Sequence, residues 1–293
     1  MKRLFLLCCC LAAAVPFSAR GESLERALRA VTDSVRATVG VAVVFGDGDT
    51  LAVNGGRCYP MLSVCKFHQA LAVLDRLDRR GLPLTTRIPV RRSDLLPGTW
   101  SPLREACPGG GRFTVAELLT YSVAQSDNNV CDVLFRFLGG TEAVDRYIAG
   151  LGIGETVIVA DEEMMHRHTD NQYLNRTTPL AAVRLLELFR RGELLSAAYG
   201  DFLLETMFAT ETGPDKLRGL LPADVAVAHK TGSSDRDGRG VKIADNDIGI
   251  VRLPDGRSYS IAVFAMDSRE DDRTNAAVIA RISRLVYDYA ARR

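Results

Sequence analysis

The sequence lacks the patterns that mark several large protein classes. It contains no internal repeat, no low-complexity tract and no long run of like charges, and beyond its first residues no apolar stretch is long enough to span a bilayer. Its net charge of +1 neither favours nor excludes nucleic acid or an acidic membrane through bulk attraction. What remains is a globular composition, 47% hydrophobic and 25% charged, in 293 residues, which allows one large domain or two interleaved ones.

Lysine and tryptophan are scarce, so each such residue is informative. The five lysines are residues 2, 66, 216, 230 and 242, and the one tryptophan is Trp100. A lone tryptophan is usually a core residue, but Trp100 is flanked by glycine, serine and proline in the segment 98–102. Two interpretations stay open here, a core residue or a partly exposed wall of a pocket.

The start of the chain has the pattern of a secretory signal peptide. A basic start precedes an apolar run from Leu4 to Val15, too short for a comfortable spanning helix, and Phe17-Ser18-Ala19 then offers a small-residue cleavage site. We expect cleavage near Ala19, which makes residues 1–19 the signal and predicts export to the periplasm. Lipid attachment at one of cysteines 8–10 is a weaker alternative, because the residues before them are not the small ones usual there.

Cysteine use is compatible with export. The mature chain keeps four cysteines, and an even number permits disulfides in an exported protein: Cys58, Cys65, Cys107 and Cys131. Two of them, Cys65 and Cys131, lie in apolar helical patterns, where a free buried thiol is the more frequent state. The sequence therefore predicts no particular pairing.

Hydrophobic periodicity separates the ends of the chain from its middle. Runs typical of strands occur near both ends, and helix-period runs open and close the chain and fill its middle. We therefore predict an α+β fold, in which residues 20–59 and 210–293 form an antiparallel sheet flanked by N- and C-terminal helices. Residues 60–209 are expected to form an all-helical lobe, with a site in the groove between the two.

Local signals predict several boundaries in the helical part. Thr114-x-x-Glu117 is a capping box, Thr141 is the expected N-cap of another helix, and Thr178-Pro179 is typical of an N-cap followed by the first helical residue. The proline- and glycine-rich segment 81–112 is predicted to be a loop. Residues 152–177 lack periodicity and are predicted to be a long loop, a kind of segment that is often functional.

The first candidate for chemistry is Ser63-Val64-Cys65-Lys66. A helix-period run follows it and is closed by Gly81, so Ser63 is expected at a helix N-terminus with Lys66 one turn further on the same face. The amine can then take the hydroxyl proton, while N–H groups of the first turn face a developing oxyanion. Alone, the S-x-x-K pattern is weak, because it arises by chance about once in a chain of this size.

Two further motifs follow in order, Ser126-Asp127-Asn128 and Lys230-Thr231-Gly232, and they account for a second of the five lysines. Together the three motifs resemble the serine β-lactamases and penicillin-binding proteins. The resemblance covers nearly the whole mature chain, and it is specific as a set although no member is specific alone. It implies a sheet divided between the two ends of the chain and an acyl-enzyme formed on a serine.

Residues 155–178 favour one branch of that group, because they resemble the Ω-loop of class A β-lactamases, which carries the deacylating glutamate. Glu162 matches that glutamate best, and Glu163 is the alternative. His166 stands where many class A enzymes have an asparagine that helps to hold the hydrolytic water. With Leu62 before the nucleophile, this resembles a branch with extended-spectrum cephalosporinase activity.

For the reaction itself, the resemblance implies that Ser63 attacks the lactam carbonyl. The N–H groups of Ser63 and Ser233 form the oxyanion hole. Either Lys66 or Glu162 acting through a water takes the proton. Glu162 then activates the water that cleaves the acyl-enzyme.

For substrate binding, the resemblance implies that Ser126 passes a proton to the leaving nitrogen and that Lys230 keeps it poised. Lys230, Thr231 and Ser233 bind the substrate carboxylate on a strand that includes Gly232. Asn128 donates to the substrate acylamide, and Trp100 resembles an aromatic gate of the pocket.

One family feature is missing from its expected place. Family members often use an arginine for the substrate carboxylate, and the expected strand position falls near Asn246. Arg218, Arg269 and Arg273 are the remaining candidates from the sequence.

Other functions remain as alternatives. A penicillin-binding DD-peptidase or a non-enzymatic β-lactam sensor shares the short motifs, and Glu162 is the feature that distinguishes the β-lactamase. The pattern His166-x-His168-x-Asp170 resembles a metal-hydrolase motif, but a zinc site needs further ligands and only His68 and His229 remain. We expect no metal or cofactor, a small β-lactam as partner, no nucleic acid, no stable membrane association and a monomer.

Overall fold

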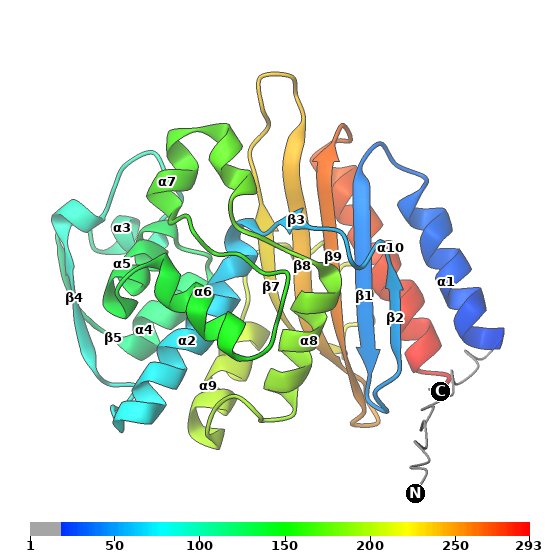
Figure 1. Ribbon diagram of the computed structural model, residues 1–293, viewed down its shortest axis with the longest axis horizontal. Helices are drawn as coiled ribbons and strands as arrows, with labels where there is room; N and C mark the ends of the chain where they lie inside the picture. The colour runs from blue at the N-terminus through cyan, green and yellow to red at the C-terminus, as the bar shows by residue number, and fades with distance from the viewer. Residues whose placement is uncertain (1–18) are drawn as a thin grey trace, which may run out of the picture.

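The computed structural model describes residues 19–293 (Figure 1). The signal peptide expected over residues 1–19 lies outside the described residues, except for Ala19. Within 19–293 there is no helix of the length and apolarity needed to cross a membrane.

The centre of the molecule is a five-stranded antiparallel sheet in the order β2-β1-β9-β8-β7. Its strands are β1 (Thr38–Phe45), β2 (Thr50–Val53), β7 (Ala226–Ser233), β8 (Lys242–Arg252) and β9 (Ser258–Ser268). Because β1 pairs with β9, from Thr38 opposite Met266 to Phe45 opposite Tyr259, the two ends of the chain share one sheet. The predicted α+β fold is confirmed.

Alternation along the strands supplies two hydrophobic cores. In β1, Val41 and Val43 belong to one core, whereas Ala42 and Val44 belong to the other, as the period of two in a strand requires. Helices α1 (Ala19–Thr32) and α10 (Asp272–Ala290) contribute to the first core and pack together at one side of the sheet (Figure 1).

The second core is the larger and lies under the helices of the middle of the chain. These helices are α2 (Cys65–Arg80), α4 (Val115–Leu119), α5 (Asn128–Leu138), α6 (Thr141–Gly150), α8 (Pro179–Arg190) and α9 (Ala197–Phe208). A π-helical turn over Thr120–Ala124 follows α4. The predicted capping box holds: Thr114 accepts the Glu117 N–H at 3.1 Å, and Glu117 accepts the Thr114 N–H at 2.7 Å. Thr178 likewise caps α8.

The loop predicted over 81–112 is wrong in part. Strands β4 (Arg87–Arg91) and β5 (Gly110–Thr114) pair in a small antiparallel sheet, and α3 (Pro102–Ala106) lies between them. Pro89 is tolerated because both members of a two-stranded sheet are edge strands. Gly110 serves the pairing: its φ is +75°, and a Cβ there would lie 2.2 Å from the Val90 carbonyl oxygen.

The N-cap predicted at Thr141 is also wrong. Gly140 is the N-cap of α6, and Thr141 is its first residue. The Gly140 N–H is bonded to the Phe135 carbonyl at 2.8 Å as part of the end of α5, so one helix starts where the other finishes. The Thr141 hydroxyl donates to the Val159 carbonyl at 3.3 Å.

The long loop predicted over 152–177 contains only short elements. They are the helix α7 (Glu162–Arg167), a 3₁₀ turn over Thr169–Tyr173 and the strand β6 (Arg176–Thr177), which pairs with β3 (Tyr59–Pro60). That pairing brings the end of the loop next to the residues that precede Ser63.

Candidate active site

Ser63 lies in a tight turn that its neighbours hold from two sides. It is in the 3₁₀ turn Leu62–Val64 directly before α2, as predicted, and Leu62 has a φ of +47°, which is rare for a bulky residue. The buried side chain of Asn246 on β8 donates to the carbonyls of Pro60 at 2.8 Å and Met61 at 3.2 Å. The Asn246 amide thus fixes the backbone that presents the serine.

Strand β7 passes unusually close to this turn. A Cβ at Gly232 would lie 2.5 Å from the Met61 carbonyl oxygen and 3.0 Å from the Val64 nitrogen. Only glycine permits this approach, which explains the third residue of Lys230-Thr231-Gly232. The strand therefore forms one wall of the space in front of Ser63.

Lys66 is the most densely contacted group of the site. Its Nζ is fully buried and donates to the Ser63 hydroxyl at 2.9 Å, the Ser126 carbonyl at 2.9 Å and the Asn128 side-chain oxygen at 2.5 Å. It also lies 2.9 Å from Glu162 Oε1. Burial is the largest single influence and lowers the pKa of Lys66, but the Glu162 carboxylate together with Cys131 and Cys65 raises it by more, so the net shift is upward.

Lys230 approaches from the opposite wall. Its buried Nζ donates to the Ser126 hydroxyl and to the Thr231 carbonyl, both at 2.9 Å. Ser126 has a φ of +60°, so its hydroxyl and its carbonyl reach two different lysines. Burial and then the nearby charge of Lys66 lower the pKa of Lys230 to about 7.

Side chains, rather than strand pairing, hold the segment that carries Glu162. Asp132 on α5 accepts the Glu162 N–H at 2.7 Å and the Glu163 N–H at 3.0 Å. Burial raises the pKa of Asp132 to about 7, although these two bonds favour its charged form. Residues 159 and 160, just before this segment, are held by the buried side-chain amide of Asn175. Its oxygen accepts both of their N–H groups, and its nitrogen donates to the carbonyl of residue 160.

Asn175 also connects this segment to the nucleophile. Its own carbonyl accepts the Met61 N–H at 2.8 Å. Asn175 therefore connects the two ends of the segment that carries Glu162 and supports the turn that contains Ser63.

The two adjacent glutamates differ in their surroundings. Glu162 is buried beside Lys66, whereas Glu163 is exposed and bonded to Arg167 at 2.6 Å. This geometry favours Glu162 over the alternative as the group that faces Ser63.

A polar chain crosses the mouth of the site between α5 and α7. Asn128 Nδ2 donates to the Thr99 hydroxyl at 2.7 Å, which lies 3.0 Å from His166 Nε2, and His166 Nδ1 lies 2.8 Å from the Glu162 carbonyl oxygen. A carbonyl can only accept, so Nδ1 carries a proton, and in neutral His166 the other nitrogen accepts from Thr99. His166 thus braces the backbone of Glu162.

Trp100 is not a core residue. It is 57% exposed, and its indole nitrogen donates to the Gln125 carbonyl at 2.8 Å. Its neighbour Asp127 is buried and accepts bonds from Ser101, Leu103 and Val130, so Asp127 holds the loop together.

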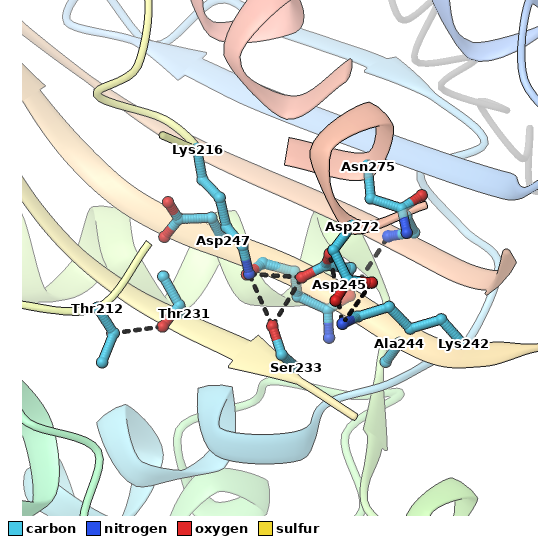
Figure 2. A network of polar contacts seen from close by, with 12 residues as sticks. Thr212, Lys216, Thr231, Ser233, Lys242, Ala244, Asp245, Asp247, Asp272 and Asn275 are labelled. Atoms are coloured by element: carbon cyan, nitrogen blue, oxygen red, sulfur yellow. Dashed lines mark hydrogen bonds and ion pairs between the residues drawn. The ribbon is translucent and has the colours of Figure 1, made fainter. Parts of the chain in front are cut away.

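The cation beside Ser233 is a lysine that the sequence analysis did not assign. Lys216 Nζ lies 2.8 Å from the Ser233 hydroxyl and 2.5 Å from Asp245 Oδ1 (Figure 2). The three arginines considered from the sequence, Arg218, Arg269 and Arg273, are exposed. The scarcity of lysine was the signal that could have pointed to Lys216.

Two further points concern metals and thiols. Among the described residues, no three histidine, cysteine or carboxylate side chains form a group that could hold a metal ion. The four cysteines of residues 19–293 are free.

The comparisons with known proteins agree with this geometry. Residues 23–290 match the Beta-lactamase enzyme family. A β-lactamase of Bacteroides uniformis is 47% identical over 267 residues, 90% of each chain. The crystal structure of TLA-3 extended-spectrum β-lactamase superimposes with a TM-score of 0.91 at 46% identity, covering 92% of this chain and 98% of that one. A representative class A β-lactamase from Bacteroides cellulosilyticus superimposes with a TM-score of 0.90 at 44% identity, covering 93% of this chain and 98% of that one. The protein belongs to the class A β-lactamase family.

Proposed function

We propose that this protein is an extended-spectrum β-lactamase that hydrolyses its substrates through an acyl-enzyme on Ser63. Hydrolysis of a cyclic amide follows from the family, and the roles of the individual residues are our assignment. The observation that carries this assignment is the set of contacts at Lys66, whose Nζ meets both the Ser63 hydroxyl and the Glu162 carboxylate.

In the first step, Ser63 Oγ attacks the lactam carbonyl carbon. Lys66, or Glu162 through a water, takes the hydroxyl proton, and the N–H groups of Ser63 and Ser233 stabilise the oxyanion. The lactam C–N bond then breaks, its nitrogen receives a proton from the Ser126 hydroxyl, and the proton taken from Ser63 replaces that proton on Ser126. The bond of that hydroxyl to Lys230 supports this role.

In the second step, Glu162 acts as the general base. It takes a proton from a water that attacks the acyl-enzyme ester, the ester C–O bond breaks, and the proton passes through Lys66 to the departing Ser63 Oγ. The Glu162 N–H donates to Asp132 and the Glu162 carbonyl accepts from His166, and both bonds support its fixed position.

Cationic and hydroxyl groups on β7 receive the carboxylate of the substrate. Lys230, Thr231 and Ser233 belong to the strand, and Lys216 stands behind Ser233. Lys216 fills the role for which the sequence offered no arginine at the expected position. Asn128 donates to the acylamide of the substrate, and exposed Trp100 borders the entrance.

We assign the protein to the periplasm as a monomer. The basic and apolar pattern of residues 1–19 supports export. A monomer is the expectation that membership of the family supports.

The decisive experiment mixes the purified mature protein with a large excess of a chromogenic cephalosporin and ends with an intact-mass measurement. Sustained turnover with no lasting adduct is expected. A stop after one equivalent with a stable adduct on Ser63 would instead indicate a DD-peptidase or a sensor. Activity lost with a chelator and restored by zinc would overturn the serine mechanism.

A further inference from the structure

A charged network lies directly behind Ser233, at the edge formed by β7 and β8 (Figure 2). Ser233 is the last residue of β7, and Asp245 is its partner across the strands. Lys216, which precedes β7, reaches both: its Nζ lies 2.8 Å from Ser233 Oγ and 2.5 Å from Asp245 Oδ1. Lys216 and Asp245 are only 6% and 3% exposed, whereas Ser233 is exposed.

The direction of these bonds matters, because a hydroxyl has only one proton. An ammonium can only donate, so Ser233 Oγ accepts from Lys216. The Ser233 hydroxyl then donates to Asp245 Oδ1 at 2.7 Å. Its proton points into the protein, away from the space in front of Ser63.

Asp245 therefore binds both groups that could otherwise bind an incoming anion, the Ser233 hydroxyl and the Lys216 ammonium. It accepts the proton of Ser233 and neutralises much of the charge of Lys216. A second lysine, Lys242, lies 3.9 Å from Asp245 Oδ2 and 3.2 Å from the exposed Asp272, so the negative charge of Asp245 is shared on its far side. Asp247, the next residue on the same face of β8, lies 3.0 Å from His229 and accepts the Leu217 N–H.

We propose that Asp245 is a positioning residue that competes with the substrate carboxylate for Ser233 and Lys216, and so sets how strongly anionic substrates are bound. This inference rests on the proposed function, in which that carboxylate is received on β7. When an anionic substrate binds, the Ser233 hydroxyl rotates from one carboxylate to the other. Asp245 keeps its contacts with the two lysines, so no buried charge is left unpaired.

The consequence is selectivity between charged and neutral substrates. An internal carboxylate weakens the field that attracts an anion but has little effect on a substrate that carries no charge at this place. Removing the charge of Asp245 strengthens binding of the anionic substrate alone, whereas the chemistry at Ser63 is unchanged.

The test compares one cephalosporin as the free carboxylate and as its methyl ester. In Asp245→Asn, which keeps the size of the side chain, we expect KM for the acid to fall by about fivefold or more while kcat and the KM for the ester stay within about twofold. Asp272→Asn is the matched control, because it removes one negative charge beside Lys242, which Asp245 also contacts, without facing Ser233. It is expected to leave the ratio of the two KM values unchanged.

The outcomes separate this inference from the proposed function. If wild-type enzyme shows equal KM values for acid and ester, the placement of the carboxylate on β7 fails. If wild type prefers the acid but Asp245→Asn raises both KM values together, Asp245 merely holds Lys216 in place and the inference fails. Asp245→Ser provides a second variant, and loss of a cooperative thermal transition in both would also overturn the proposal, because Asp245 would then be a folding residue.

Discussion

Two lysines face each other across the site, equally buried but oppositely perturbed. Lys66 lies 2.9 Å from the carboxylate of Glu162, and its pKa is raised despite burial. Among residues 19–293, Lys230 meets a hydroxyl and a carbonyl but no carboxylate, and burial lowers its pKa to about 7. Because both lysines are fully buried, the opposite directions of their pKa shifts come from their neighbours.

Two buried histidines also differ in their partners. His229 lies 3.0 Å from the carboxylate of Asp247. His68 is just as buried, but its Nδ1 meets only the Val64 carbonyl at 3.3 Å, and its Nε2 has no hydrogen-bond partner among the described residues. Burial lowers the pKa of His68 to about 4.

The largest effect is expected from removing the carboxylate that faces Lys66. Glu162→Gln keeps the shape but loses the base, so deacylation should slow by about a thousandfold while acylation continues with Lys66 as its base. Intact mass during turnover should show the acyl-enzyme as the main species. Glu163→Gln is the matched control, because its side chain is exposed and bonded to Arg167. Accumulation in Glu163→Gln alone would reassign the base.

His68, whose Nε2 has no hydrogen-bond partner among the described residues, should make the protein sensitive to acid. In the unfolded chain, His68 binds a proton below its ordinary pKa of about 6.5. In the folded chain it binds that proton only below about pH 4. The free energy of unfolding therefore falls as the pH drops through this window, by about 3 kcal/mol in total.

Chemical denaturation at about pH 7 and about pH 4 measures this fall in the free energy of unfolding. His68→Met should lose about 3 kcal/mol less than wild type on acidification. His168→Gln is the control, because His168 is exposed, and it should behave as wild type does. Identical acid sensitivity of all three proteins would show that His68 is protonated when folded.

The smallest effect concerns the order in which the two lysines lose their protons. Lys230 is the ammonium expected to deprotonate first, near pH 7, so kcat/KM for an anionic substrate should fall by up to about tenfold per pH unit above that value. With only four lysines after residue 19, NMR of ¹³Cε-labelled lysine can follow each directly. Lys230→Arg and Lys66→Arg assign the signals. Titration of Lys66 before Lys230 would break the comparison.

Local patterns predicted much of the fold and part of the site. The helix after Ser63, the capping box at Thr114 and the strands at both ends depend on neighbours in sequence, and all are present. The loop predicted over 81–112 is wrong because the strands there depend on a tertiary contact. Pro89 and Gly110 are typical of loops, but the pairing of β4 with β5 accommodates both.

The residues that escaped prediction act across long separations. Asp132 on α5 reaches Glu162, and two residues outside the helices and strands act in the same way: Asn175 reaches Met61, and Lys216 reaches Asp245. No periodicity or short motif marks such contacts, because their partners become neighbours only when the sheet and the helices have assembled.

The place of β1 in the sheet has a consequence for how the protein is made. Thr38 pairs with Met266, so the first strand has only β2 beside it until β9 has emerged from the ribosome. Such long-range pairing slows folding, because a large loop must close before any contact rewards it. The central sheet can therefore be completed only after its last strands have been made. That delay suits a protein that we expect to pass through a membrane channel unfolded and to assemble on the other side.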